Sequence, residues 1–359
     1  MTLSPLFQLH YKPKLPIKSD YGIGVIGAGQ IVNQAHLPAY RNAAFRVLAI
    51  TDIDSVAANN TAARFNIPRV CRSVDELLEM PEIDIVDIAV PAMHNPALAA
   101  KAFEAGKHVL VQKPMAETTT QASAMVEAAR RHGRKLAVNQ QMRWSPAVRA
   151  ASDLVGRGLL GDLLQCSIDI EIRTPWDLWP WLRDHPYPEI YYHTIHHVDT
   201  VRAWLRDPIR IYASLARYPD TTYKGPTRNY MVFIYPNNLR ATFLVNHHTA
   251  APNDEWRAEF RIEGTRGWCQ GLVGLLLNYP TGRPDVIKFA HQELIPGGSV
   301  EMELEGRWFP DAFVGPMSSL MDAITNGTEP ETSGEEILGT LRLLEAIRKS
   351  HETNQAVTL

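Results

Sequence analysis

The stretch Gly106-Lys107-His108-Val109-Leu110-Val111-Gln112-Lys113-Pro114 decides how the first half of this chain folds. Its apolar run, Val109-Leu110-Val111, predicts a short buried strand. The strand must end at Pro114, because proline has no N–H to donate to a sheet ladder. Lys113 therefore lies at the carboxyl end of a buried strand, which is where open parallel sheets bind their ligands. An ammonium in this place is either part of a structural ion pair or a catalytic group.

Strands and helices alternate on both sides of this stretch. Pro91 stops one strand, and Gly106 ends a helix as an ordinary C′ residue. Repeated alternation of this kind predicts a doubly wound parallel sheet. The expected strands are 23–26, 47–51, 83–90, 109–111 and 135–139, and the expected helices are 31–40, 55–65, 75–80, 96–105 and 119–132.

A glycine-rich turn, Gly27-Ala28-Gly29-Gln30-Ile31-Val32, follows the first strand. Gly27 permits a tight turn and Gly29 permits close approach of the backbone to a pyrophosphate. The helix that follows would favour phosphate through its N-terminal amides. Val32 stands where the full fingerprint has a third glycine, so an ordinary strand-to-helix turn remains the alternative.

Two aspartates follow the second strand. Asp52 lies about 20 residues beyond the glycines, where an acidic residue bonds the ribose 2′-hydroxyl of a dinucleotide. A carboxylate there would repel a 2′-phosphate, which favours NAD over NADP. The alternative is that one of the two only caps the next helix, and Asp54 suits that cap better because an apolar helical pattern follows it directly.

The composition limits the remaining possibilities. A chain of 359 residues predicts two domains, and a net charge of −3 argues against a nucleic-acid or membrane partner. Cys71, Cys166 and Cys269 are odd in number and widely spaced, which fits a reducing compartment and excludes a disulfide framework. Residues 1–20 lack the apolar core of a signal peptide. We therefore expect a cytoplasmic protein with an extended N-terminal arm over 1–20.

These motifs resemble the glucose–fructose oxidoreductase/inositol dehydrogenase (Gfo/Idh/MocA) family. The resemblance covers nearly the whole chain after the arm. It rests on the glycine turn and on the segments His36-Leu37-Pro38-Ala39, Asp52-Ile53-Asp54, 105–114, Arg143-Trp144-Ser145-Pro146 and Thr332-Ser333-Gly334-Glu335-Glu336. It implies an α/β protein with a Rossmann domain (21–142) and an α+β domain (143–359) built on a large, mostly antiparallel sheet. The last helix could pack back on the Rossmann domain.

The resemblance also implies site residues. Lys113 matches a lysine that lies beside the nicotinamide and the reacting hydroxyl, but Gln112 stands where the family has glutamate. Asn95 aligns with a family histidine, which His94 does not replace. The cofactor contacts implied are Gly27, Gly29, Gln30, Ile31, Asp52, Pro91, Asn95, Gln112, Lys113, Gln141 and Arg143.

The second half carries the substrate residues that we expect. Further strands are predicted at 163–172, 209–216, 229–235, 241–245 and 256–263, after a helix over 147–157. Trp176, Trp179 and Trp181 lie within six residues of one another. Indole rings of this kind either stack on a sugar face or pack a loop over the sheet.

A histidine-rich segment, 191–199, is predicted to be helical, with Tyr192, His193, His196 and His197 on one face. The family has Asp-x-x-x-His here, so His196 matches a substrate-site histidine and Tyr192 replaces the aspartate. A metal site that uses these histidines with His247-His248 is the competing interpretation, weakened by the lack of a matched carboxylate. Plain core histidines are the structural alternative.

Together these residues predict a NAD-dependent oxidoreductase acting on a CH–OH group of a sugar, polyol or derivative. Lys113, His196 and Tyr192 are the predicted catalytic residues, and Trp176, Trp179 and His193 join them as substrate residues. Two alternatives remain open: an enzyme that retains its NAD and cleaves glycosides or eliminates through a transient keto-sugar, and a non-catalytic NAD-binding regulator. The expected partners are a small carbohydrate-like substrate and further copies of the chain, joined through the C-terminal sheet.

Overall fold

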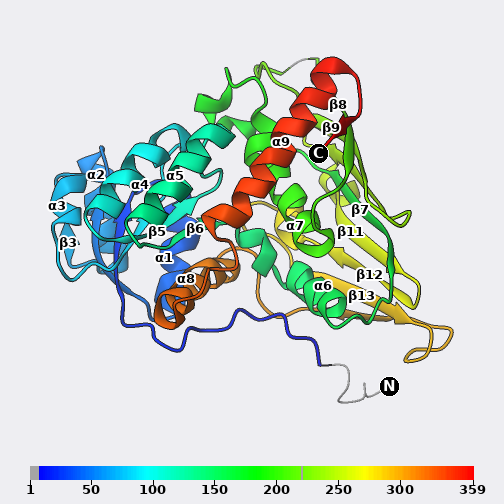
Figure 1. Ribbon diagram of the computed structural model, residues 1–359, viewed down its shortest axis with the longest axis horizontal. Helices are drawn as coiled ribbons and strands as arrows, with labels where there is room; N and C mark the ends of the chain where they lie inside the picture. Colours follow the sequence, from blue (N-terminus) through cyan, green and yellow to red (C-terminus); the bar gives the residue numbers. More distant parts are fainter. Residues whose placement is uncertain (1–7, 220) are drawn as a thin grey trace. The chain divides into compact units, whose positions relative to one another are not determined.

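The computed structural model describes residues 8–219 and 221–359, which form two compact units (Figure 1). The Rossmann unit contains residues 13–141 and 309–341. The described residues of the second unit, which we call the large-sheet unit, lie within 8–12, 142–308 and 342–359. The first seven residues of the predicted arm lie outside the described residues.

A six-stranded sheet forms the centre of the Rossmann unit, in the order β3-β2-β1-β4-β5-β6. Every neighbouring pair is parallel. This order, with its reversal between β1 and β4, confirms the predicted doubly wound sheet. The strands are β1 (Gly22–Ile26), β2 (Arg46–Thr51), β3 (Arg69–Val70), β4 (Ile85–Ile88), β5 (His108–Gln112) and β6 (Leu136–Asn139).

Helices connect these strands as the alternation predicts. The helix expected over 31–40 contains a π-helical turn, Val32–His36, that runs directly into α1 (Leu37–Asn42). A later helix, α8 (Val314–Asn326), packs against β5 and β6 and was not predicted. The others are α2 (Ser55–Phe65), α3 (Val74–Leu78), α4 (Asn95–Glu104) and α5 (Thr119–Arg131).

The large-sheet unit is built on nine strands in the order β14-β13-β12-β11-β7-β10-β9-β8-β15. Only β7 and β10 pair in parallel among the described strands of this sheet, so the sheet is mostly antiparallel, as expected. The strands are β7 (Leu163–Glu171), β8 (Arg210–Ala216), β9 (Arg228–Ile234), β10 (Arg240–Asn246), β11 (Arg257–Gly264), β12 (Gly267–Leu272), β13 (Val286–His291), β14 (Val300–Glu303) and β15 (Val357–Thr358).

One face of the large sheet is buried and the other is partly exposed. Buried and exposed residues alternate along β8, β9 and β10. Helix α6 (Pro146–Gly156) packs against β12 and β13 and also against α7 (Ile195–Leu205). The twenty-residue helix α9 (Gly334–Thr353) divides between the two units at Arg342.

The predicted strands of the second half are confirmed as β7 to β11, with small differences at their ends. The predicted strands did not include β12, β13, β14 or β15, and of these β12 and β14 depart from the usual strand composition. β12 contains two glycines, and β14 has the sequence Val-Glu-Met-Glu. Helix α8 was missed because Gly315 and Pro316 interrupt its first turn.

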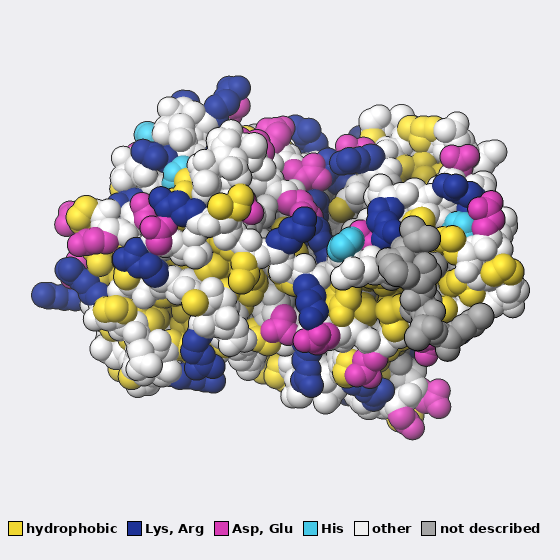
Figure 2. Space-filling view, turned by 90° about the horizontal axis from the view of Figure 1, so that it is seen from below, with side chains coloured by type: hydrophobic (Ala, Val, Ile, Leu, Met, Phe, Trp, Pro, Cys, Tyr) yellow, Lys and Arg dark blue, Asp and Glu magenta, His cyan; other side chains and the backbone are white. Residues whose placement is uncertain are grey.

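The surface carries charges of both signs. On the face shown in Figure 2, basic and acidic side chains are interspersed. This distribution agrees with the small net charge of −3. Among the described residues, no helix is both long and apolar enough to cross a bilayer.

Candidate active site

The glycine turn lies at the carboxyl end of β1. Gly27 has φ +112°, and a Cβ built there would come within 2.5 Å of the Ala89 carbonyl oxygen, so no side chain fits. Gly29 is exposed and has no atom within 4 Å of its built Cβ position. A tight turn beside an open backbone position fits the close approach of a dinucleotide phosphate. Gln30 and Ile31 follow, exposed and half-buried respectively.

Asp52 and Asp54 have separate tasks. Asp54 Oδ1 accepts from the backbone N–H groups of Val56 (2.9 Å) and Ala57 (3.2 Å), which confirms it as the N-cap of α2. Asp52 lies just after β2 and reaches back to the glycine turn. Its Oδ2 accepts from the Ala28 N–H at 2.6 Å and its Oδ1 from the Asp54 N–H at 2.8 Å. The carboxylate therefore lies beside the turn, and its ribose contact remains a prediction.

Lys113 follows the last residue of β5 and is half-buried. Burial lowers the pKa of its ammonium to about 7, because an apolar surrounding penalises the charged form. Near neutral pH the side chain can therefore exist as an amine or as an ammonium. Strongly perturbed pKa values of this kind cluster at functional sites.

Two amide side chains hold the backbone around Lys113. Gln112 Oε1 accepts from the Lys113 N–H at 2.7 Å. Asn95, which is fully buried, donates through Nδ2 to the carbonyls of Pro114 (3.1 Å) and Gln112 (3.4 Å). Asn95 thus supports the strand end, and its predicted cofactor contact remains a prediction.

Behind Gln112 lies a fully buried histidine, His36. A backbone N–H only donates, so Gln112 must turn its oxygen to Lys113 and its NH₂ to His36 Nε2 (3.0 Å). Asn139 Nδ2 lies 3.2 Å from the same ring nitrogen. His36 Nε2 is therefore an acceptor, and the ring proton is on Nδ1.

The Nδ1 side of His36 completes this network. Nδ1 donates to Asp87 Oδ2 at 2.7 Å, and Tyr40 donates its O–H to the same oxygen at 2.8 Å. Burial and the neighbouring Asp87 both raise the pKa of Tyr40, so it remains a donor. A chain of hydrogen bonds with one fixed proton arrangement thus connects Asp87 to the backbone of Lys113.

Three other predicted cofactor residues lie in different surroundings. Pro91 is exposed just after β4, and Gln141 is buried. Arg143 is buried in the large-sheet unit and donates to both oxygens of Asp199, each at 2.7 Å. These bonds fasten Arg143 to helix α7, and a cofactor role for Arg143 remains a prediction.

The predicted histidine helix starts with a π-helical turn, Ile190–Thr194, before α7. The shared face of the four side chains remains a prediction. Tyr192 lies against Trp181 (ring centroids 5.1 Å apart), whereas His196 lies against Trp308 (5.2 Å). His193 lies against Trp176 and Trp179. π-helical turns inside helices are frequent at functional sites.

The tryptophan segment does not expose all three indoles. Trp176 is buried and donates its Nε1–H to the His247 carbonyl at 3.3 Å. The centroid of its ring lies 4.8 Å from that of the His193 ring. Trp179 is half-buried, and the centroid of its ring lies 5.3 Å from that of the His193 ring. Trp181 is the most exposed of the three tryptophans. Trp179 and His193 are thus both half-buried, and their predicted substrate contact remains a prediction.

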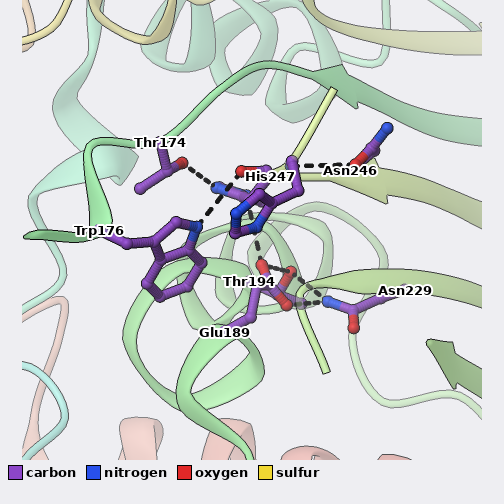
Figure 3. Close-up of polar contacts among 8 residues, drawn as sticks. Thr174, Trp176, Glu189, Thr194, Asn229, Asn246 and His247 are labelled. Carbon is purple, nitrogen blue, oxygen red and sulfur yellow. Dashed lines mark hydrogen bonds and ion pairs between the residues drawn. The ribbon is translucent and has the colours of Figure 1, made fainter. Parts of the chain in front are cut away.

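Sequence reasoning missed Glu189, which is fully buried beside His247 (Figure 3). Its Oε1 lies 3.3 Å from His247 Nε2 and accepts from Thr194 Oγ1 at 2.7 Å. Its Oε2 accepts from Asn229 Nδ2. Asn229 and His247 belong to segments far along the chain from Glu189, so no local pattern indicates this cluster.

The metal interpretation has no support in the arrangement of these side chains. Within 8–219 and 221–359, no group of three or more His, Cys, Asp or Glu residues could hold a metal ion. His248 stacks on Trp176, whereas His193 meets the Trp176 ring edge-on and the His247 ring at a tilt.

Comparison with known proteins agrees with this geometry. Residues 21–140 match the model of an oxidoreductase family with an NAD-binding Rossmann fold, and residues 148–270 match the GFO/IDH/MocA C-terminal domain. The chain is 25% identical to the D-apiose dehydrogenase of Paraburkholderia graminis, over 93% of this chain and 88% of that protein. It is 24% identical to the 1,5-anhydro-D-fructose reductase of Ensifer adhaerens, over 94% and 98%.

Solved structures share the fold. The aldose-aldose oxidoreductase of Caulobacter crescentus, crystallised with glycerol, has a TM-score of 0.81 at 21% identity, over 95% of this chain and 100% of that chain. An oxidoreductase of Agrobacterium radiobacter, crystallised with NAD+, L-tartaric acid and magnesium, has a TM-score of 0.81 at 20% identity, over 94% and 98%. With both family models matched along the chain, this protein belongs to the Gfo/Idh/MocA family of oxidoreductases.

Proposed function

We propose that the protein is a NAD-dependent oxidoreductase that acts on a CH–OH group of a sugar, polyol or sugar derivative. The observation that carries the proposal is Lys113. It follows the strand next to the topological switch point of a Rossmann sheet, and burial lowers its pKa to about 7. A lysine with a perturbed pKa in that place suits a group that bonds a reacting hydroxyl and stabilises the developing alkoxide.

The cofactor would be held by the glycine turn and by Asp52. The open backbone at Gly29 leaves room for the pyrophosphate, and Asp52 would accept from a ribose hydroxyl. A 2′-phosphate would meet the Asp52 carboxylate, which is why we propose NAD rather than NADP. When bound, NAD supplies a hydride acceptor, and the residues of this chain supply the proton chemistry.

Three side chains would share that proton chemistry. Lys113 bonds the reacting hydroxyl and stabilises the developing alkoxide. His196 takes the hydroxyl proton as the hydride leaves the carbon, since imidazole titrates near neutral pH. Tyr192 donates to a substrate oxygen in place of the carboxylate that the family pattern has at this position.

The half-buried surface of Trp179 and His193 supports a carbohydrate substrate, because indole faces bind the apolar faces of sugars. Trp176 would support this surface from behind, since its ring is buried and its N–H is bonded. The names of the relatives, a D-apiose dehydrogenase and a 1,5-anhydro-D-fructose reductase, point to the same substrate class.

We also propose that copies of the chain associate through the exposed face of the large sheet. Tyr212, Tyr230, Val232 and Leu244 are each 36–45% exposed on the adjacent strands β8, β9 and β10. Tyr212 pairs with Val232, and Tyr230 pairs with Leu244, so the four side chains are contiguous. Contiguous apolar patches commonly mark association surfaces.

The test is a panel of polyols, aldoses, sugar acids and nitrophenyl glycosides with NAD or NADP, followed by NADH or NADPH absorbance. We expect NADH from a free polyol or aldose, with NAD preferred. Glycoside cleavage without net NADH would overturn the dehydrogenase proposal in favour of the NAD-retaining alternative. NAD binding without either reaction would favour a regulatory protein.

A further inference from the structure

The pair formed by Glu189 and His247 has no part in the reaction proposed above. Both residues are almost completely buried, at 0% and 1% exposure. Glu189 precedes the π-helical turn, and His247 follows strand β10. Figure 3 shows the two side chains facing each other within one hydrogen-bonded cluster of the large-sheet unit.

The groups that bond Glu189 are donors. Thr194 donates its hydroxyl to Oε1 at 2.7 Å and also donates its backbone N–H to the carboxyl, and Asn229 Nδ2 donates to Oε2. The nearest acceptor for a carboxyl proton is therefore His247 Nε2, 3.3 Å from Oε1. On its other side, His247 Nδ1 lies 2.6 Å from Thr174 Oγ1, which can donate to it or accept from it.

Burial disfavours the charged form of both members. It raises the pKa of Glu189 to about 8, although the bonds from Thr194 act in the opposite direction. It lowers the pKa of His247 well below its usual range, and the neighbouring His197 and His248 lower it further. A single proton on Glu189, donated to His247, leaves both groups neutral and satisfied.

The groups that face this pair are also histidines or distant cations. His193 and His197 approach from the helix, with the His193 ring centroid 5.0 Å from that of His247. Burial lowers the pKa of His197 to about 4, so it adds no charge near neutral pH. The basic groups near His248 are Arg173 and Arg228, and both lower the pKa of that histidine.

We propose that Glu189 is a protonated carboxylic acid that donates to His247 Nε2, and that this neutral pair positions His193 for contact with a substrate hydroxyl. The proposal rests on the proposed function, because it assigns His193 a task in the same site. His193 is half-buried, and its ring lies against His247, Trp176 and Trp179. Glu189 and His247 are thus positioning residues, and His193 is the residue that would touch substrate.

The first test measures the proton itself. Infrared difference spectra between the wild type and Glu189→Gln would be recorded from about pH 6 to about pH 9. We expect a carbonyl band of a protonated carboxyl in the wild type that disappears with a midpoint near pH 8. A carboxylate band at neutral pH, with no titration near pH 8, would overturn the proposal.

The second test measures the positioning role. The carboxamide introduced by Glu189→Gln can donate to His247 and accept from Asn229, whereas the methyl group of Glu189→Ala can do neither. We expect the Gln variant to keep KM within about threefold and to lose any alkaline dependence of KM, and the Ala variant to raise KM about tenfold with less change in kcat. An alkaline rise of KM that persists in the Gln variant, or an Ala effect confined to kcat, would refute the role.

Asp285→Asn is the matched control. Asp285 is another buried carboxylate of this unit, but it accepts from three donors: Ser145 Oγ (2.5 Å), the Ala147 N–H (3.0 Å) and the Gly274 N–H (2.8 Å). An amide there would oppose donor to donor, so we expect lower thermal stability with an unchanged pH dependence of KM. If the wild type turns over no sugar at all, the proposed function and the positioning role both fall, while the infrared result still judges the protonated pair.

Discussion

Two buried histidine–carboxylate pairs, one in each unit, occur among residues 8–219 and 221–359, and they differ in how their protons are held. His36 Nδ1 lies 2.7 Å from Asp87 Oδ2, and the amide groups that donate to Nε2 fix the tautomer of the imidazole. His247 Nε2 lies 3.3 Å from Glu189 Oε1, and burial raises the pKa of Glu189 to about 8. The same two functional groups thus form a fixed support in the Rossmann unit and a titratable pair in the large-sheet unit.

The difference follows from the neighbours. Around His36, a backbone N–H orients Gln112, Gln112 orients the ring, and Tyr40 adds a second donor to Asp87. Around Glu189, the donors are the Thr194 hydroxyl, the Thr194 backbone N–H and the Asn229 amide, and burial favours a carboxyl that keeps its own proton. The pairs therefore differ in the direction of the shared proton and not in the number of donors: His36 donates to Asp87, whereas the proposed proton of Glu189 points to His247.

The largest expected effect comes from removing each imidazole. His36→Leu leaves Asp87 buried without its ring donor and leaves Gln112 without its acceptor, so we expect a loss of about 3–5 kcal/mol in the free energy of unfolding. His247→Leu leaves a neutral acid that keeps its three other donors, so we expect about 1–3 kcal/mol. Urea unfolding of both variants measures the difference, and equal losses would contradict the distinction between the pairs.

The next largest effect is expected in the pH dependence of the free energy of unfolding, which should distinguish the two pairs. An acid whose folded pKa is raised stabilises the fold below its unfolded pKa, near 4.3, and this contribution is lost as pH rises to the folded pKa of about 8. Between about pH 6.5 and about pH 8, the wild type should therefore lose about 2 kcal/mol relative to Glu189→Gln. The other histidines cancel in this comparison, and parallel stability curves would show that Glu189 is ionised in the fold.

A smaller effect is expected where the fixed network meets Lys113. Gln112→Glu would place a carboxylate beside His36 Nε2 and next to the lysine, which favours the charged form of both. We expect the limb of the pH–rate profile that reports Lys113 to move by about one unit to higher pH. Gln112→Met, which adds no charge, is the control, and an equal shift in it would refute the electrostatic explanation.

The smallest effect on either pair should come from the exposed face of the large sheet. Val232→Asp places a charge between Tyr212 and Thr242 on neighbouring strands. We expect sedimentation velocity to show a smaller assembly than the wild type, with the pH dependence of KM unchanged. An assembly of unchanged size would remove this face as the association surface.

Much of the fold could be predicted because local signals mark its boundaries. Pro91 and Pro114 stop strands, Gly106 ends a helix, and Asp54 caps one. The signals fail where composition and structure disagree. β12 is a strand although it contains Gly267 and Gly271. Only glycine fits at position 271, because a Cβ there would come within 2.1 Å of the Phe260 ring.

The site could be predicted less completely, because burial and long-range contacts define it. Lys113 was found since its strand ends at a proline, but the support from His36 depends on how Gln112 turns. The π-helical turn at Ile190–Thr194 was not predicted, because the sequence pattern there is that of a regular helix. Glu189 has no local signature, since segments far along the chain bury it.

The central claim is that Lys113 bonds the reacting hydroxyl and stabilises the developing alkoxide in a NAD-dependent oxidation. The most direct test is single-turnover NADH formation by Lys113→Met with the best polyol or aldose, alongside NAD affinity measured by calorimetry. The account predicts a rate at least about a hundredfold lower, with NAD affinity within about threefold of the wild type. A wild-type rate in this variant would contradict the account.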